Sequence, residues 1–396
     1  MWGRRVVPAW LLAVALALGA CTTTAPTLAE SDPLPVDAGG GAVPAAPAGP
    51  LRVSISSNDK LPGAVVAAAK ALPGVLRAGA RRTGMVNLLE LVGAEHPIPR
   101  RPAGTILPIS VEAHEAALVA AFPGLGPEAD ALRAGQAVVP RAQAEFRGLS
   151  VGDAIVLSHA ARVRVRVGAI TDDERVFRSE LIVPPSAADR LGLERSRAIV
   201  LAVAPAAAVA IEDALEAIVG DQEIRVRVSQ PDAGTFSFDG RRLLPLAEVK
   251  MTFGEFWYRP LAGIAIAVDP AWRRANIVQQ SVPLLGSVTC HRKVLPQLTG
   301  AMGELQSRGL GKLVKSFSGC YSPRMQVADD GELSRHAFGI AVDINAGSNP
   351  YGAKPRQDAR IVEVMERWGF NWGGRWNTPD AMHFEFSAFP DGQAGG

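Results

Sequence analysis

Two stretches of the chain alternate strictly between a charged arginine and an apolar residue, at Arg162–Val167 and Ile224–Val228. A period of two is typical of a strand with one buried face, so both stretches are predicted to be half-buried strands with a solvated arginine face. Between them, Ala206–Val219 has apolar residues at near-helical spacing and ends at Gly220. The apolar residues of this predicted helix are Val209, Ile211, Leu215 and Ile218. Residues 51–250 are therefore predicted to form an N-terminal α+β domain.

Two further helices are predicted in the last third of the chain. The first runs from about Lys293 to Ser307, with its apolar residues on one face, and Gly309 follows it. The second is Ala359–Trp368, with Asp358 directly before it and a glycine directly after it. A short acidic side chain caps the free N–H groups of a first helical turn, and glycine past a helix adopts the left-handed backbone that ends it.

Two short stretches beside these helices, residues 338–345 and 382–386, alternate with a period of two and are predicted to be strands. Together these elements predict a C-terminal domain over residues 276–390, with a small antiparallel sheet and packed helices. The expected fold class of the whole chain is α+β. Residues 251–275 are rich in aromatic side chains and contain two prolines, so we expect a connector between the two domains.

The N-terminus has the pattern of an export signal. Two arginines precede an apolar run from Val6 to Leu18, which is too short to span a bilayer comfortably. The run ends in Leu18-Gly19-Ala20-Cys21, which resembles the bacterial lipobox. Residues 1–21 are therefore predicted to be a lipoprotein signal peptide with its lipobox, in which Cys21 receives a lipid and becomes the new N-terminus after cleavage. The alternative is ordinary secretory cleavage near an unmodified Cys21. Residues 22–50 have almost no large apolar side chains and are predicted to be a disordered tether.

Composition narrows the class of protein. The chain has 396 residues, of which 48% are hydrophobic and 20% charged, so it has enough apolar material for two folded domains. The formal net charge is only +2, and no block of lysine and arginine alternates with aromatic residues. A nucleic-acid partner is therefore not expected. With the N-terminal pattern, we expect an exported protein that is anchored to the membrane through its lipid and faces the cell wall or periplasm.

The other two cysteines, Cys290 and Cys320, form an even pair in an exported domain, a setting that favours a disulfide. Two alternatives remain at this point. Both residues could be buried thiols, or Cys290 could act as a nucleophile with the adjacent His291, although neighbours in sequence rarely face each other.

The clearest chemistry lies in the segments SRHAFGIAVD (Ser334–Asp343) and PDAMHFEF (Pro379–Phe386), which supply two imidazoles and two carboxylates from His336, Asp343, Asp380 and His383. Three such groups can hold a zinc ion and leave its fourth position to water, while the remaining carboxylate can accept a proton. Gly339 would allow His336 to turn back from the preceding loop toward the same place.

The strand patterns suggest where these side chains point. Alternation places Asp343 beside the small residue Ala341, and it places His383 and Glu385 together on one face of the second strand. Asp380 lies three residues before His383, so it must occupy the preceding turn in order to lean over the site.

The spacing S-x-H-x-x-G-x-A-x-D, followed about forty residues later by D-x-M-H-F-E, resembles the M15 family of zinc D,D-peptidases and L-alanyl-D-glutamate endopeptidases. Further matches to this family are Gly319–Arg324, Asn349–Tyr351 and Gly369–Gly374. The resemblance covers roughly residues 276–388 and implies the zinc fold that D,D-peptidases share with hedgehog domains. In the N-terminal half, Leu149–Leu157 faintly resembles the periplasmic part of large exporter permeases.

The family resemblance implies a role for each residue. His336, Asp343 and His383 would be the zinc ligands, and Asp380 the base that takes a proton from water. Arg324 would bind a substrate carboxylate or steady the oxyanion that forms during cleavage. Ser334 and Glu385 are candidates for orienting the ligands, or could have a purely structural role.

The expected function is that of a lipid-anchored zinc peptidase that hydrolyses peptidoglycan stem peptides, as a D,D-carboxypeptidase or an L-Ala-D-Glu endopeptidase. Many carboxypeptidase relatives have Glu before a Trp-His pair, whereas Asp380-Ala381-Met382-His383 is closer to the endopeptidase branch. The alternative is a non-catalytic lipoprotein that binds wall peptides or acts as a scaffold. The role of residues 51–250 stays open, with an envelope protein partner as one interpretation.

Overall fold

The computed structural model describes residues 49–57, 61–172, 179–193, 196–220, 222, 224–229, 237–238, 241–242, 244–326, 332–376 and 378–389. The signal segment, the lipobox with Cys21 and nearly all of the predicted tether lie outside these ranges. Within them, no helix has the length and apolar character needed to cross a membrane.

The N-terminal part of the described chain is built on a mixed sheet with the strand order β3-β7-β4-β6-β5-β2-β8-β1-β9. Its strands are β1 (Leu51–Ser57), β2 (Val75–Val92), β3 (Pro108–Ala113), β4 (Ala137–Pro140), β5 (Ala154–Ser158), β6 (Arg162–Thr171), β7 (Leu181–Val183), β8 (Ser196–Val203) and β9 (Ile224–Ser229). Because β3 also pairs with β2, the pairings from β2 through β5, β6, β4 and β7 to β3 form a closed cycle, a small barrel.

Strand β6 shows why the barrel forms. Val163, Val165 and Val167 are buried in the apolar cluster inside the barrel, whereas Arg162, Arg164 and Arg166 are exposed. The predicted half-buried strand with a solvated arginine face is thus confirmed, and β9 confirms the second predicted strand. Successive side chains on a strand point to opposite faces, so the sequence pattern alone separates core from solvent here.

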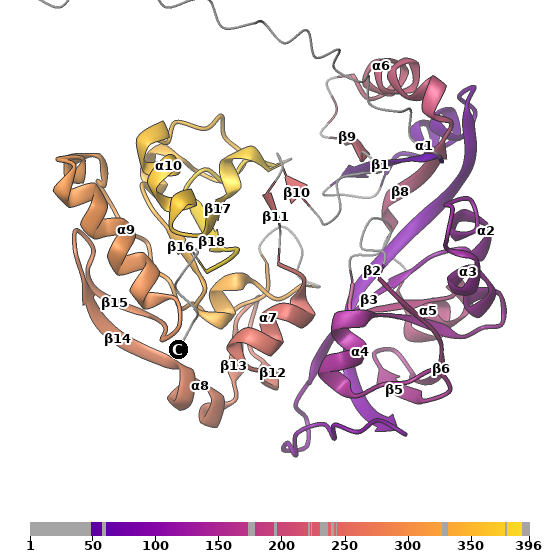
Figure 1. Ribbon diagram of the computed structural model, residues 1–396, viewed down its shortest axis with the longest axis horizontal. Coiled ribbons are helices and arrows are strands. Elements are labelled where there is room, and N and C mark those ends of the chain that lie inside the picture. Colours follow the sequence, from indigo (N-terminus) through magenta and orange to yellow (C-terminus); the bar gives the residue numbers. More distant parts are fainter. Residues whose placement is uncertain are drawn as a thin grey trace, which may run out of the picture. The chain divides into compact units, whose positions relative to one another are not determined.

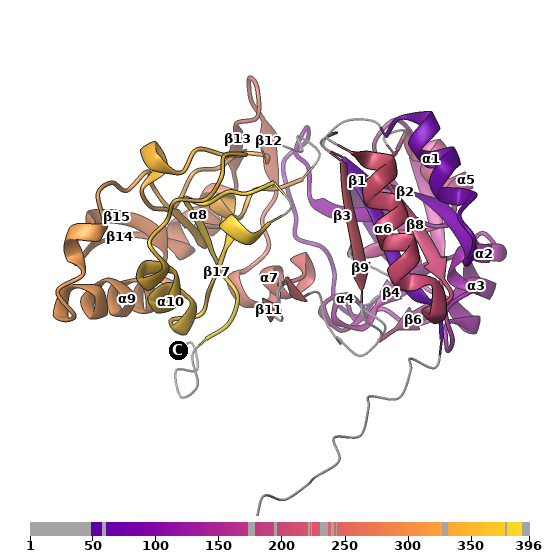
Figure 2. The same ribbon diagram turned by 90° about the horizontal axis from the view of Figure 1, so that it is seen from above.

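Helices cover the outer surfaces of this sheet (Figures 1 and 2). Helices α2 and α3 pack on the outer face of β4 and β7, and α1 and α6 lie side by side against β1 and β8. Helix α6 confirms the predicted helix and ends at Gly220, but Val209 is 74% exposed and does not belong to its buried face, because Ile211, Leu215 and Val219 define that face. The bounds are α1 (Gly63–Lys70), α2 (Ala116–Val119), α3 (Gly126–Arg133), α4 (Arg141–Arg147), α5 (Pro185–Leu191), the 3-10 turn η1 (Pro205–Ala207) and α6 (Ala208–Val219).

The C-terminal part contains a three-stranded antiparallel sheet in the order β16-β18-β17, with α9 and α10 beside it. Its elements begin with β10 (Ser237–Phe238), β11 (Arg241–Arg242), α7 (Leu246–Phe253), β12 (Tyr258–Pro260), β13 (Ile266–Val268), α8 (Pro270–Asn276), β14 (Ile277–Val282) and β15 (Gly286–His291). They continue with α9 (Leu295–Ser307), η2 (Gly311–Leu313), η3 (Arg335–Phe338), β16 (Ala341–Asp343), η4 (Ala346–Ser348), α10 (Ala359–Arg367), β17 (Phe370–Trp372), η5 (Gly373–Arg375) and β18 (His383–Phe386). The described helices and strands are consistent with an α+β class.

Both predicted helices of this part are confirmed by α9 and α10, and the Asp358 carboxylate caps α10 by accepting a hydrogen bond from the Arg360 backbone N–H. The predicted strand over 338–345 is shorter, since only Ala341–Asp343 is extended. The chain before it forms the 3-10 turn η3, and Asn345 after it has a left-handed φ of 60°.

The aromatic segment 251–275 is part of the C-terminal core and does not behave as a free connector. The Phe253 ring lies 5.0 Å from that of Phe386, and the Phe256 ring lies 4.6 Å from those of both Trp272 and Phe338. Large aromatic side chains gain stability when they are buried together, which explains why this composition does not leave a linker.

Cys290 and Cys320 form a disulfide with a Cα–Cα distance of 5.4 Å. It joins the end of β15 to the loop that leads to Arg324. The neighbouring His291 is buried, its Nε2–H donates to the Phe253 carbonyl oxygen, and burial lowers its pKa to about 4. A bridged Cys290 beside a neutral, hydrogen-bonded imidazole does not fit the alternative of a nucleophilic Cys-His pair.

Replacing both cysteines by alanine is expected to lower the free energy of unfolding by about 3 to 4 kcal/mol, because the bridge closes a loop of sequence separation 30. Denaturant unfolding of the variant and of the oxidised parent measures this difference. Reducing the parent should reproduce most of the loss. Alkylation of both thiols in unreduced, denatured parent protein would show that the bridge does not form.

Candidate metal centre

Two of the candidate side chains are brought together by backbone pairing alone. Strands β16 and β18 are antiparallel, and Asp343 lies directly opposite His383 in their register. Opposite residues on neighbouring strands point to the same face with their Cβ atoms about 5 Å apart. The carboxylate and the imidazole therefore meet without any help from a loop.

The third side chain, His336, comes from η3, which is held at both ends. At its start, the Ser334 hydroxyl oxygen accepts a hydrogen bond of 3.3 Å from the His336 backbone N–H. At its end, Gly339 adopts a left-handed φ of 66°, and a Cβ there would lie 2.8 Å from the backbone nitrogen of His291. Only glycine satisfies both the backbone angle and the space, so the turn that aims His336 depends on Gly339.

His336, Asp343 and His383 form a group that could hold a metal ion. His336 Nε2 lies 3.2 Å from His383 Nδ1 and 3.3 Å from Asp343 Oδ1, and His383 Nδ1 lies 3.2 Å from the same oxygen. Neighbouring ligands of a tetrahedral zinc ion with bonds of about 2.0–2.1 Å are separated by roughly 3.3–3.4 Å. The three atoms thus already have the spacing of one face of such a tetrahedron, and the donor set fits zinc.

Each imidazole has an outer partner that fixes which ring nitrogen faces the centre. The Nδ1–H of His336 donates to the Cys320 carbonyl oxygen over 2.8 Å, and the Nε2–H of His383 donates to Glu385 Oε2 over 3.3 Å. The remaining nitrogen of each ring is directed inward. A carboxylate or carbonyl behind a ligating histidine orients the ring and raises its basicity. Glu385 therefore contacts His383 directly, whereas Ser334 acts on the backbone of the turn.

Asp380 lies in the turn before β18. Its backbone N–H donates to the Gly373 carbonyl oxygen over 2.9 Å, and its own carbonyl oxygen accepts from the His383 N–H over 3.0 Å. Its side-chain Oδ1 is buried and has no hydrogen-bond partner among the residues that the structure describes. A buried carboxylate oxygen without a partner is costly, so this atom has capacity for a ligand, a water or a substrate proton.

The ionisable side chains of this site shift one another's pKa values. Burial raises the pKa of Asp380, against the opposing effect of the His383 charge. Burial would likewise raise the pKa of Asp343, but hydrogen bonds from His336 and His383 outweigh it and hold that pKa well below its usual range. Burial would lower the pKa of His383, but its hydrogen bonds to Asp343 and Glu385 raise it to about 10. Positive charge is therefore favoured at the centre.

Arg324 is half-buried and lies close enough for its charge to lower the pKa of Asp380. Its backbone pairs with Ala265, and its carbonyl oxygen accepts a hydrogen bond of 3.2 Å from the Ser334 N–H. The structure therefore brings all the candidate residues of the two motifs together with Arg324.

The sequence did not single out two groups that lie at the site. One is Trp376, whose ring lies 5.1 Å from that of His383. The other is the Cys320 carbonyl, because a backbone carbonyl has no sequence signal.

Comparisons with known proteins give one family match. Residues 328–386 match an M15 peptidase model described as D-alanyl-D-alanine carboxypeptidase. The matched residues include His336, Asp343, Asp380 and His383, whereas Arg324 lies just before them. Curated protein sequences give no match.

Among solved structures, the periplasmic region of MacB from Actinobacillus actinomycetemcomitans is similar at 11% identity and a TM-score of 0.30, covering 44% of this chain and 87% of that one. The extracellular domain of the noncanonic ABC-type transporter YknZ from Gram-positive bacteria is similar at 10% identity and a TM-score of 0.29, covering 45% of this chain and all of that one.

We expect the purified protein to bind one zinc ion, and His383→Ala to weaken that binding more than about 100-fold, because even the outer partner of a ligand contributes 10–100-fold. Competition with a chromophoric chelator measures the affinity. The matched control is His96→Ala, which removes an exposed imidazole in the N-terminal part. Equal affinity in the two variants would exclude His383 as a ligand.

Zinc affinity should also depend on pH. With its pKa raised to about 10, His383 is protonated at neutral pH and must lose a proton in order to bind metal through Nδ1. The apparent affinity should therefore rise about tenfold for each pH unit between pH 6.5 and 8.5. Calorimetry in two buffers of different ionisation enthalpy should detect the released proton. An affinity that does not change with pH would mean that the ring is already neutral.

Proposed function

We propose that this protein is a zinc-dependent peptidase that hydrolyses peptide bonds in peptidoglycan stem peptides, exported and held at the membrane by a lipid on Cys21. One observation carries the proposal. The inward atoms of His336, Asp343 and His383 form a triangle with edges of 3.2–3.3 Å, beside the buried Oδ1 of Asp380, which lacks a partner in the described chain. The M15 match over the same residues supports the substrate class.

The chain's own residues account for most of the chemistry. His336, Asp343 and His383 would hold the zinc ion, which when bound acts as a Lewis acid and lowers the pKa of a bound water to about 7. Asp380 would accept the proton of the attacking water and later pass it to the leaving amine. Burial supports this role, because it raises the pKa of Asp380 and so strengthens the carboxylate as a base.

Arg324 would act on the substrate. Its planar guanidinium carries a fixed set of donors that matches a carboxylate or the oxyanion of a tetrahedral intermediate. Glu385 and the Cys320 carbonyl would hold the two imidazoles in one orientation while Asp380 exchanges its proton. These outer contacts support a site that is organised before substrate binds.

The proposal includes two alternatives for the peptide bond that is cleaved. The matched family model is described as a carboxypeptidase, whereas Asp380 in place of glutamate is closer to the endopeptidase branch. A carboxypeptidase releases a terminal D-alanine, and an endopeptidase divides the stem internally. Mass spectrometry of stem pentapeptides and cross-linked muropeptides, incubated with the zinc-loaded full chain, separates the two by fragment mass. Cleavage that persists in His383→Ala, or no cleavage by zinc-loaded parent, would contradict the proposal and favour a wall-peptide-binding lipoprotein.

Asp380→Asn should keep zinc affinity within a few-fold of the parent but lower kcat by about 100- to 10,000-fold, the range typical of a removed general base. Asparagine has nearly the same shape, so the site should stay folded. Chelator competition and turnover of one stem peptide, measured on the same preparation, make the comparison. Full turnover in Asp380→Asn would remove Asp380 from the mechanism.

A further inference from the structure

A continuous backbone ladder connects the N-terminal barrel with Arg324. Ile106, just before barrel strand β3, exchanges two hydrogen bonds with Tyr258 of β12, of 2.8 and 2.9 Å. Strand β12 pairs with β13, and Ala265, directly before β13, pairs with Arg324. The Arg324 backbone thus forms the next rung of a ladder that begins at the barrel.

The backbone hydrogen bonds at the Arg324 end of this ladder lie next to the candidate centre. The Ile266 N–H donates to the Pro323 carbonyl oxygen over 3.1 Å, and the Met325 N–H donates to the Ile264 carbonyl oxygen over 2.8 Å. These two bonds lie on either side of Arg324 and fix its backbone. Met325 also pairs with Leu333, directly before the Ser334 cap of the turn that carries His336.

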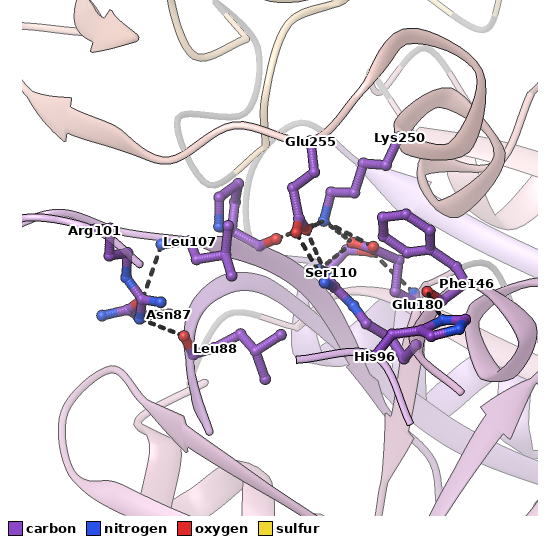
Figure 3. A network of polar contacts seen from close by, with 12 residues as sticks. Asn87, Leu88, His96, Arg101, Leu107, Ser110, Phe146, Glu180, Lys250 and Glu255 are labelled. Atoms are coloured by element: carbon purple, nitrogen blue, oxygen red, sulfur yellow. Dashed lines mark hydrogen bonds and ion pairs between the residues drawn. The ribbon is translucent and has the colours of Figure 1, made fainter. Parts of the chain in front are cut away.

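A buried cluster of charged side chains holds Lys250 and Glu255, which precede β12, against the barrel (Figure 3). Lys250 on α7 is 2% exposed, and its ammonium donates to Glu180 Oε1 over 2.8 Å and to the Pro108 carbonyl oxygen of β3. Glu255, just after α7, accepts two hydrogen bonds from Arg147 at the end of α4 and lies 3.5 Å from the Lys250 ammonium. We call Arg147, Glu180, Lys250 and Glu255 the charge clamp.

The charge clamp is balanced in charge, and the buried Nε of Arg147 is its one side-chain atom without a hydrogen-bond partner in the described part of the chain. It contains two carboxylates and two cations, and Glu180 Oε2 also accepts a hydrogen bond of 2.9 Å from the Ser110 N–H. Burial would raise the pKa of Glu255, but the charges of Lys250 and Arg147 hold it below its usual range. A buried ion pair adds little net stability compared with apolar packing, but removing one partner leaves an unpaired charge. Such a cluster favours one arrangement of the elements that it joins.

We propose that the charge clamp and the β12–β13 hairpin position Arg324 for the substrate, so that the barrel takes part in catalysis without contacting the metal centre. Lys250, Glu255, Glu180 and Arg147 are positioning residues in this scheme. The role of Arg324 in binding the substrate rests on the proposed function. The structural connection between the charge clamp and the Arg324 backbone does not depend on that function.

The test uses the full chain with Lys250→Met, which keeps the aliphatic stem and removes the charge. The charge-balanced double variant Lys250→Met/Glu180→Gln is its matched partner. The control, Arg162→Ala, breaks an exposed ion pair with Glu90 elsewhere on the barrel. Hydrogen exchange is followed in peptides covering 258–268 and 319–326, with 277–291 as an internal reference.

The first readout is independent of activity. Lys250→Met should raise the exchange rate of the Ile266 and Met325 amides by about tenfold or more, and the double variant should restore much of their protection, while the reference segment stays unchanged. Unchanged exchange in 258–268 and 319–326 would overturn the mechanical connection, whether or not the protein proves to be a peptidase. If Lys250→Met does not fold, Glu255→Gln carries the same comparison.

The second readout is a double-mutant cycle, which tests whether the charge clamp affects catalysis through Arg324. Lys250→Met should lower kcat/KM about tenfold in the parent but less than about twofold in an Arg324→Ala background, with zinc affinity unchanged in both. Equal losses in the two backgrounds would show that Lys250 does not act through Arg324. Absence of cleavage by zinc-loaded parent would instead contradict the proposed function and leave the exchange result to decide the connection.

Discussion

Asp343 and His383 face each other across one antiparallel strand pair, and the rest of the candidate centre is arranged around that contact. The pairing brings a carboxylate and an imidazole together on a buried face, where neither is favourable without a counter-charge. Glu385 behind His383, the Cys320 carbonyl behind His336 and the disulfide that holds the Cys320 loop all restrain the same few atoms. The local fold therefore gathers negative and lone-pair groups around one point, where they could hold a small cation.

The charge clamp and the candidate centre differ in one informative way. In the charge clamp, two acids and two bases form ion pairs, so their charges balance. At the candidate centre, the His383 pKa is raised to about 10 and the pKa of Asp343 is depressed, which shows a site that favours an additional positive charge. Buried groups whose charges balance hold elements in one arrangement, whereas a site that favours a further positive charge could hold a cation.

The sequence predicted much of this local structure but little of its assembly. The alternation of β6 and the caps of α10 are local signals, and both are present in the fold. The motif spacing also identified His336, Asp343, Asp380 and His383 as one group. Closure of the barrel could not be predicted, because it depends on β2 meeting β3 along its second edge, which no periodicity records. The composition of 251–275 predicts a connector, whereas the segment belongs to the C-terminal core, because composition does not record which core receives the aromatic rings.

Strand β2 pairs with three other strands of the mixed sheet. Its first half pairs with β8 and its second half with β3 and β5, with register shifts between Arg81 and Arg82 and between Leu88 and Glu90. A slip by one residue along this strand would turn its side chains to the wrong face of the sheet, both in the barrel and beside β8. Moreover, β1 finds its partners only in β8 and β9, near the end of the N-terminal part. During synthesis, the first strand therefore stays unpaired until nearly the whole N-terminal part has emerged. Such long-range pairing slows folding and exposes the chain to misassembly.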